Sequence, residues 1–406
     1  MPLSVEAPFC FPQEGILAVE KFSLKEETMR ILAAIFGIVL IVLVFQDAFE
    51  SVVLPRRVVR RIRITRLFYL VTWNGWKSLS RIMRPGTRRE SYLSYFGPLS
   101  LLALFGFWAV LFVFGFGLLL WGLALPLNAP EKSISFVTYL YLSGTTFFTL
   151  GLGDVTPVPG VARLLVVIEV ALGFGALALV IGYMPVIYQA FSRRELRISL
   201  LDARAGSPAS AAELLRRNHA GKNIEELRLL LHDWEEWCAD ILESHLSYPA
   251  LAYYRSQHQA QSWLEVLTTI MDTCALILAG IEGIPVDPAR FAFAMARHTA
   301  VDLAQVFNTP PTPGVNRLSS SEYAHLREVL AAYGIRLKEE TATERKLAEL
   351  RETYEPFVSA LANFLLVSLP PWITPEDNLD DWQTSAWDDI LPSSIRHTLD
   401  KVIHGE

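Results

Sequence analysis

The sequence predicts an all-α membrane protein with three transmembrane helices and one short helix that enters the membrane and returns, followed by an all-helical cytoplasmic domain. Three observations support this fold class. The 406 residues are 52% hydrophobic, with a mean hydropathy of +0.31, which is high for a water-soluble chain of this length. Three apolar segments are long enough to cross a bilayer. The second half of the chain is charged and shows helical patterning without such segments.

The three long apolar segments define the membrane part of the chain. After an N-terminal segment (residues 1–28), the first predicted span is a peripheral helix over residues 29–54. The second lies within residues 91–130, which contain no charged residue. The third covers residues 163–191 and contains one acid, Glu169. About 20 apolar residues suffice to cross the hydrocarbon layer, so each segment meets the requirement.

Basic residues predict how these spans are oriented. The linker at residues 55–93 is rich in arginine, and arginine and lysine concentrate on the cytoplasmic side of membrane proteins. We therefore expect a cell-membrane protein with its N-terminus outside and its C-terminal region in the cytoplasm. The aromatic stretch at residues 67–83 predicts an interfacial helix on the inner surface. An anionic-lipid site is one interpretation of the basic cluster, and topology alone is the other; the cluster comprises Arg56, Arg57, Arg60, Arg61, Arg63 and Arg66.

The region after the third span has a different character. Residues 192–370 predict a cytoplasmic helical domain, which resembles no family that we recognise, and residues 371–406 form an acidic tail. The domain is a candidate for sensing an unknown cytoplasmic ligand or for holding an assembly together. The apolar run at 263–284 contains three acids and predicts a buried helix better than a fourth span. We expect helices near residues 247–281, 287–307, 320–334 and 338–368.

Residues 135–160, SFVTYLYLSGTTFFTLGLGDVTPVPG, connect the second and third spans. The apolar part, residues 136–148, is too short to cross the membrane as a helix. Backbone at membrane depth must otherwise pair its polar groups or line a water-filled path. Alternating Gly151 and Gly153 allow successive carbonyls to point the same way, because glycine tolerates left-handed conformations. Thr149 adds a hydroxyl oxygen, so the segment predicts a pore helix followed by a row of cation ligands.

This segment resembles the potassium-channel pore family, whose filter reads T-V-G-Y-G-D. Thr149, Gly151, Gly153 and Asp154 match that signature, and the resemblance covers roughly residues 95–190. It implies a homotetramer, in which dehydrated K⁺ ions pass between backbone carbonyls of residues 149–153 with Asp154 at the outer mouth. No other cofactor or metal is implied.

The sequence departs from the family pattern beside these matches. Leu150 and Leu152 stand where valine and tyrosine are usual, as in some loops of animal two-pore-domain potassium channels. Their side chains point away from the ion, so the carbonyl ligands are retained. Thr145, Thr146 and Phe148 precede the filter as its support, and Phe148 replaces a usual threonine.

Three residues of the third span are gating candidates, and each has an alternative role. Gly173 lies where many such channels have a flexible inner-helix glycine, but small residues also permit close helix packing. Pro185 can kink the helix. Glu169 can line the cavity or brace the filter from behind; alternatively it is paired with Arg163 or buried in a protonated state.

These features predict a tetrameric potassium-selective channel, gated at the filter or at the inner helix. A weakly selective monovalent cation channel is the nearest alternative. A potassium transporter subunit and a membrane-anchored scaffold or signalling protein are alternatives of other classes. The chain shows no recognisable catalytic constellation and no nucleic-acid-binding pattern, so we expect neither an enzyme nor a nucleic-acid partner.

Overall fold

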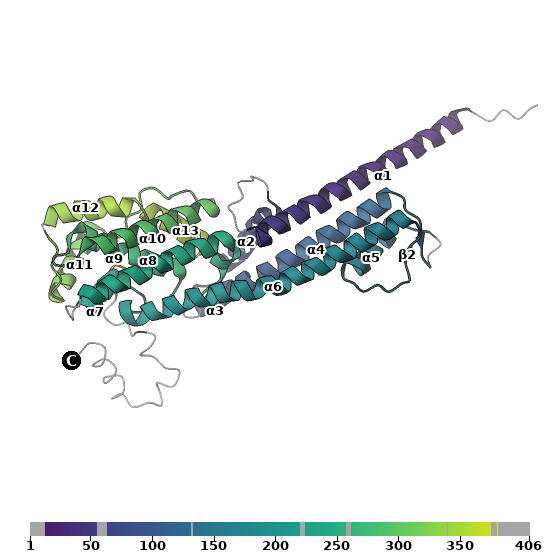
Figure 1. The fold of residues 1–406 in the computed structure, drawn as a ribbon. Coiled ribbons are helices and arrows are strands. Elements are labelled where there is room, and N and C mark those ends of the chain that lie inside the picture. Colours follow the sequence, from purple (N-terminus) through teal and green to yellow (C-terminus); the bar gives the residue numbers. More distant parts are fainter. Residues whose placement is uncertain are drawn as a thin grey trace, which may run out of the picture. The chain divides into compact units, whose positions relative to one another are not determined.

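A computed structural model describes residues 13–54, 63–130, 133–219, 224–256, 261–338, 340–374 and 380 (Figure 1). Most of these residues are helical and very few lie in strands, which confirms the all-α fold class. The helices are α1 (Gln13–Ala48), α2 (Ile64–Ile82), α3 (Thr87–Ser94), α4 (Phe96–Gly122), α5 (Phe136–Phe147), α6 (Gly160–Ala205), α7 (Ala211–His219), α8 (Ile224–Ser247), α9 (Trp263–Gly280), α10 (Val286–Val306), α11 (Ser320–Ala332), α12 (Glu340–Glu352) and α13 (Glu355–Leu365). A π-helical turn (Phe49–Val53) follows α1, a 3₁₀ turn (Pro249–Tyr253) follows α8, and two short strands, β1 (Leu127–Asn128) and β2 (Thr156–Pro157), pair antiparallel.

The chain divides into two compact units. Among the described residues, the first contains 13–54, 63–68 and 102–184, and the second contains 69–101 and those from 185 onward. The expected pore-domain limits, at 94 and 191, stay a prediction. Helix α6 continues without a break to Ala205, well beyond the expected end of the third span.

Four described helices are long and apolar enough to cross a membrane, and their burial separates them into two kinds. The most apolar windows of Lys25–Val53, Thr87–Gly122 and Gly160–Ala205 are 17%, 39% and 11% buried by the protein itself. The window in α9 is 94% buried. Because protein rather than lipid surrounds α9, we interpret it as a core helix, in line with the sequence prediction.

Close packing of small residues joins α1 to α4 in the first unit. A Cβ atom added to Gly37 lies 2.6 Å from the carbonyl oxygen of Gly115. One added to Gly122 lies 2.5 Å from the backbone nitrogen of Ala34. Small residues are typical of such contacts between membrane helices, because they let two backbones approach closely.

Asp47, near the end of α1, is a buried carboxylate with three hydrogen-bond donors. It is 4% exposed and accepts bonds from the backbone nitrogen and hydroxyl of Thr65 and from Trp108 Nε1, at 3.0, 2.5 and 3.1 Å. These bonds hold the C-terminal end of α1 and the start of α2 against α4. They also compensate for the cost of removing the carboxylate from water.

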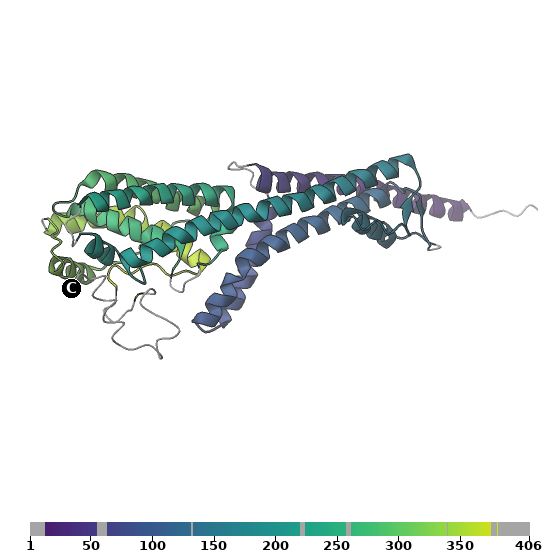
Figure 2. The same ribbon diagram turned by 60° about the horizontal axis from the view of Figure 1, so that its bottom comes forward.

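In the second unit, α9 is the central helix. It contacts α7, α10, α12 and α13, and α10 also packs along α8 (Figures 1 and 2). One expected helix, at residues 338–368, is in fact two, because the chain turns between Glu352 and Glu355. Proline at position 356 fits only the first turn of α13, where its missing N–H leaves no bond unmade.

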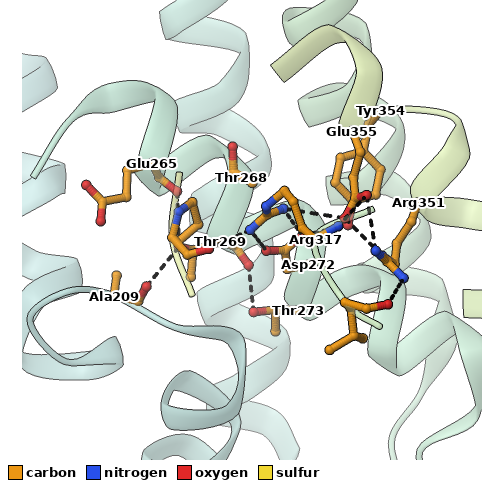
Figure 3. Close-up of polar contacts among 12 residues, drawn as sticks. Ala209, Glu265, Thr268, Thr269, Asp272, Thr273, Arg317, Arg351, Tyr354 and Glu355 are labelled. Atoms are coloured by element: carbon orange, nitrogen blue, oxygen red, sulfur yellow. Dashed lines mark hydrogen bonds and ion pairs between the residues drawn. The ribbon is translucent and has the colours of Figure 1, made fainter. Parts of the chain in front are cut away.

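A polar network crosses the core of this unit between α9, the loop before α11 and the start of α13 (Figure 3). Arg317 donates to both carboxylate oxygens of Asp272 at 3.1 and 2.8 Å, and the Tyr354 hydroxyl donates to the same carboxylate at 2.6 Å. Arg351 pairs with Glu355 at 2.9 Å. Since every charge has an opposite partner, the network fixes how these helices pack at little cost in unpaired charge.

The 3₁₀ turn after α8 joins the extension of α6 to the segment before the second span. Arg194, on α6, is 1% exposed and donates to the carbonyls of Leu251 and Tyr254 at 3.0 and 2.7 Å. The ring of Tyr253 in turn contacts that of Trp73 of α2, with the ring centroids 5.2 Å apart and the rings tilted. The indole N–H of Trp73 donates to the carbonyl of Phe364, at the C-terminal end of α13. The indole of Trp73 therefore faces protein rather than lipid, although the sequence predicted an interfacial helix here.

We expect His245 to make the second unit less stable in acid. His245 is fully buried on α8, and burial together with the nearby charge of Arg194 lowers its pKa from 6.5 to about 3. Below pH 6.5 the unfolded chain binds a proton that the folded chain does not, so stability falls as the pH drops toward 3. At pH 5 the loss approaches about 2 kcal/mol.

The measurement is the melting temperature of the detergent-solubilised protein at pH 5 and pH 7.5. His245→Leu should remove part of this difference, whereas His232→Leu, on an exposed position of the same helix, should leave it unchanged. An identical pH dependence in wild type and His245→Leu contradicts the prediction.

Candidate ion-conducting site

The short helix predicted between the second and third spans is present as α5. Ser135 and Thr138 form a capping box at its start, and Ser143 anchors its middle by donating to the carbonyl of Val113 on α4 at 2.8 Å. Figure 2 shows this short helix beside α4 and α6. Pairing of β1 with β2 closes the loop on either side of α5 and the filter.

Over the predicted filter, every second residue has a left-handed backbone conformation. Thr149, Gly151 and Gly153 have φ angles of +57°, +55° and +78°, while Leu150 and Leu152 between them are not left-handed. The sequence pattern predicted left-handed conformations at the two glycines, and we interpret the alternation as the geometry of a segment whose successive carbonyls face one side. Thr149 adopts a conformation that branched residues rarely take, so the surrounding structure must hold it there.

Hydrogen bonds from the end of α5 hold the start of this segment. The backbone nitrogen of Thr149 donates to the carbonyl of Thr146 at 2.9 Å, and those of Leu150 and Gly151 donate to the carbonyl of Thr145 at 2.8 and 3.3 Å. The predicted supports Thr145 and Thr146 therefore act through their main-chain oxygens. The partly negative C-terminal end of α5 lies directly beside the first filter residues, which favours a cation there.

The filter side chains are uncovered within a single chain. Phe148, Leu150 and Leu152 are 59%, 62% and 63% exposed, and Thr149 and Asp154 are also exposed. Apolar side chains that lie together in this way are typically covered by other parts of the protein, by a partner or by lipid. The predicted filter thus leaves a cluster of apolar side chains uncovered on the single chain.

Sequence reasoning missed a brace at the mouth of the filter. The Tyr141 hydroxyl, on α5, donates to Asp154 Oδ2 at 2.8 Å. The sequence lacks the usual filter tyrosine, at the position of Leu152, and Tyr141 supplies a phenol from the pore helix instead. Nothing in the sequence marks this pair, because the two residues meet only once the chain reverses direction.

Tyr141→Phe should weaken this brace without changing the shape of the ring. The variant removes the hydrogen bond to Asp154 and keeps the ring, so we expect a measurable fall in the fraction of time that the filter conducts. Single-channel recording measures it, with Tyr139→Phe as the control, because Tyr139 donates instead to the carbonyl of Leu125. Equal effects of the two variants contradict a specific brace at Asp154.

Two of the gating candidates contact α5 at equivalent positions. Glu169 is 0% exposed and bonded to Ser143, and a Cβ atom on Gly173 would lie 2.0 Å from the carbonyl oxygen of Phe147. The close approach at Gly173 supports the packing alternative for this glycine. Pro185 lies inside α6, which continues through it, and belongs to the second compact unit.

The predicted lipid cluster is only partly described. Arg56, Arg57, Arg60 and Arg61 lie outside the described residues. Arg63 donates to the Ser51 hydroxyl at 2.9 Å, and Arg66 is exposed.

Comparison with known proteins agrees with the geometry of this site. Residues 101–189 match the sequence model of a family described as "Ion channel". A protein of Bacillus subtilis (strain 168), described as "Uncharacterized membrane protein YdjJ", is 25% identical over 273 residues, which are 64% of this chain and 76% of the relative. No solved structure matches the chain. Residues 101–189 contain α5, the left-handed alternation and most of α6, so these elements lie in the part of the chain that is similar to this family.

Proposed function

We propose that this protein is a homotetrameric, potassium-selective channel whose filter is the backbone of Thr149, Leu150, Gly151, Leu152 and Gly153. The alternating φ angles at positions 149, 151 and 153 carry the proposal. They are what a row of carbonyls needs to face one path, and a buried loop packed against other helices has no need of them.

Four copies complete the site, because a dehydrated cation needs oxygen ligands on all sides and one chain offers only one wall. The Thr149 hydroxyl supplies an additional ligand at the inner end. The carboxylate of Asp154 raises the cation concentration at the outer mouth. The helix end at Phe147 stabilises an ion below the filter through its partial negative charge.

In this proposal the N-terminus lies outside, and the helical domain at residues 192–370 lies in the cytoplasm. The basic residues of the linker and of the α6 extension support this orientation, because arginine and lysine concentrate on the cytoplasmic side of membrane proteins. Helix α6 carries both Glu169 and Gly173 beside the filter and Arg194 in the helical domain. A change in that domain, for example on binding a cytoplasmic ligand, can therefore act on the inner helix directly.

Single-channel recording of the purified protein in a planar bilayer tests the function, with potassium on one side and sodium on the other. The proposal predicts a reversal potential close to the potassium equilibrium potential. A reversal potential near zero indicates the weakly selective alternative. Saturable flux that requires a second ion indicates a transporter, and absence of flux indicates a scaffold.

A further inference from the structure

Ser143 connects three helices through its hydroxyl group. Its Oγ lies 2.8 Å from the carbonyl oxygen of Val113 on α4 and is hydrogen-bonded to Glu169 Oε1 on α6. The contact is buried, since Ser143 and Glu169 are both 0% exposed. Val113, Ser143 and Glu169 all lie in the first compact unit.

A count of hydrogens assigns the protonation state of Glu169. A hydroxyl has one hydrogen to donate, and a backbone carbonyl has none. If Ser143 donates to an ionised Glu169, its contact with Val113 contains no hydrogen and places two acceptors together. If Glu169 is a neutral acid, it donates to Ser143, and Ser143 donates to Val113, so each contact contains one hydrogen.

The surroundings of Glu169 agree with the neutral form. Helices α4 and α5, which meet at this contact, contain no charged residue. Their titratable groups are Tyr139 and Tyr141, which donate to the carbonyl of Leu125 and to Asp154. On α6 itself, Arg163 donates to the carbonyl of Pro157, so the pairing of Glu169 with Arg163 that the sequence left open is not what the structure shows. An ionised Glu169 would have no cation beside it among the described residues.

The contact lies directly behind the filter. Glu169 and Gly173 are one helical turn apart on α6, and they meet Ser143 and Phe147, one turn apart on α5. Between those two contacts lies Thr145, whose carbonyl accepts the first filter N–H groups. The position of Ser143 therefore fixes the end of α5, whose carbonyls bind the first residues of the filter.

We propose that Glu169 acts as a neutral carboxylic acid, a positioning residue that donates through Ser143 to Val113 and so holds the pore helix at the filter. The expected effect on conduction rests on the proposed channel function. The protonation state of Glu169 is independent of that function. Ionisation would make Ser143 donate to Glu169 and release Val113, so conduction should fall as the pH rises.

Infrared spectroscopy of the purified protein tests the protonation without using flux. In a difference spectrum of wild type minus Glu169→Gln at pH 7, the carbonyl-stretch band of a protonated carboxyl group should be present, whereas any band of another buried acid, such as Glu265, cancels. Absence of this band from the difference spectrum overturns the inference, even if the protein conducts potassium. If the band is present and the protein conducts no ions, only the proposed channel function fails.

Recording in bilayers tests the positioning role. Glu169→Gln keeps a neutral donor, so it should keep the open probability of wild type and lose its dependence on alkaline pH. Glu169→Leu and Ser143→Ala break the chain of donors and should lower the open probability about tenfold. If Glu169→Leu does not assemble, the comparison of Glu169→Gln with Ser143→Ala still tests the positioning role. A Glu169→Gln protein as defective as Ser143→Ala shows that the charge is required and overturns the inference.

Discussion

Replacing Gly151 with alanine should abolish potassium flux while leaving the rest of the protein folded. Gly151 has φ = +55°, and an L-residue in this left-handed region costs roughly 1–2 kcal/mol per chain. In the proposed tetramer four such penalties act on one pore, so the conducting filter should be disfavoured by a factor on the order of 1,000 or more. Potassium efflux from liposomes, relative to the amount of reconstituted tetramer, measures the loss.

Gly106→Ala is the matched control. This glycine lies on the exposed side of α4, and a Cβ atom there meets nothing within 4 Å. A glycine within a helix is replaced by alanine without strain, so flux should equal that of wild type. Unchanged flux in Gly151→Ala would show that the left-handed conformation at position 151 is not needed for conduction.

Gly173→Ala should destabilise the pore region rather than stiffen a hinge. A Cβ atom at position 173 would lie 2.0 Å from the carbonyl oxygen of Phe147, which is backbone and cannot swing aside. Helix α6 must then move away from α5, at a cost typical of overpacking, about 1–3 kcal/mol per chain. The expected result is a lower melting temperature together with reduced flux.

Gly175→Ala, two residues further along the same helix, separates packing from flexibility. A Cβ atom there meets nothing within 4 Å in the chain. If glycine served only to let α6 bend, both variants should change gating while keeping the melting temperature of wild type. A Gly173→Ala protein as stable as Gly175→Ala contradicts the packing account.

Local sequence patterns predicted much of the fold. Three apolar runs predicted α1, α4 and α6. The apolar run at 263–284, which contains three acids, predicted the buried helix α9. Alternating glycines predicted the left-handed conformations at positions 151 and 153, because glycine adopts them at least cost. Helices expected at residues 287–307 and 320–334 agree with Val286–Val306 and Ser320–Ala332 within two residues.

Features that depend on contacts distant in sequence were not predicted. The brace from Tyr141 to Asp154 joins two elements that meet only after the chain turns. The capping of the Leu251 and Tyr254 carbonyls by Arg194 requires that α6 continue past the expected end of the span, and a run of arginines gave no sign of that. The contacts of Trp73 with the rest of the protein were not predicted either, because the apolar face of the helix expected at residues 67–83 looks the same whether lipid or protein covers it.

A density map of the purified protein in lipid nanodiscs tests the central claim most directly. The account predicts four copies around one axis, with the carbonyls of residues 149–153 facing that axis and ion density between them in potassium. A map in which this segment packs against helices or lipid away from any symmetry axis would contradict the account.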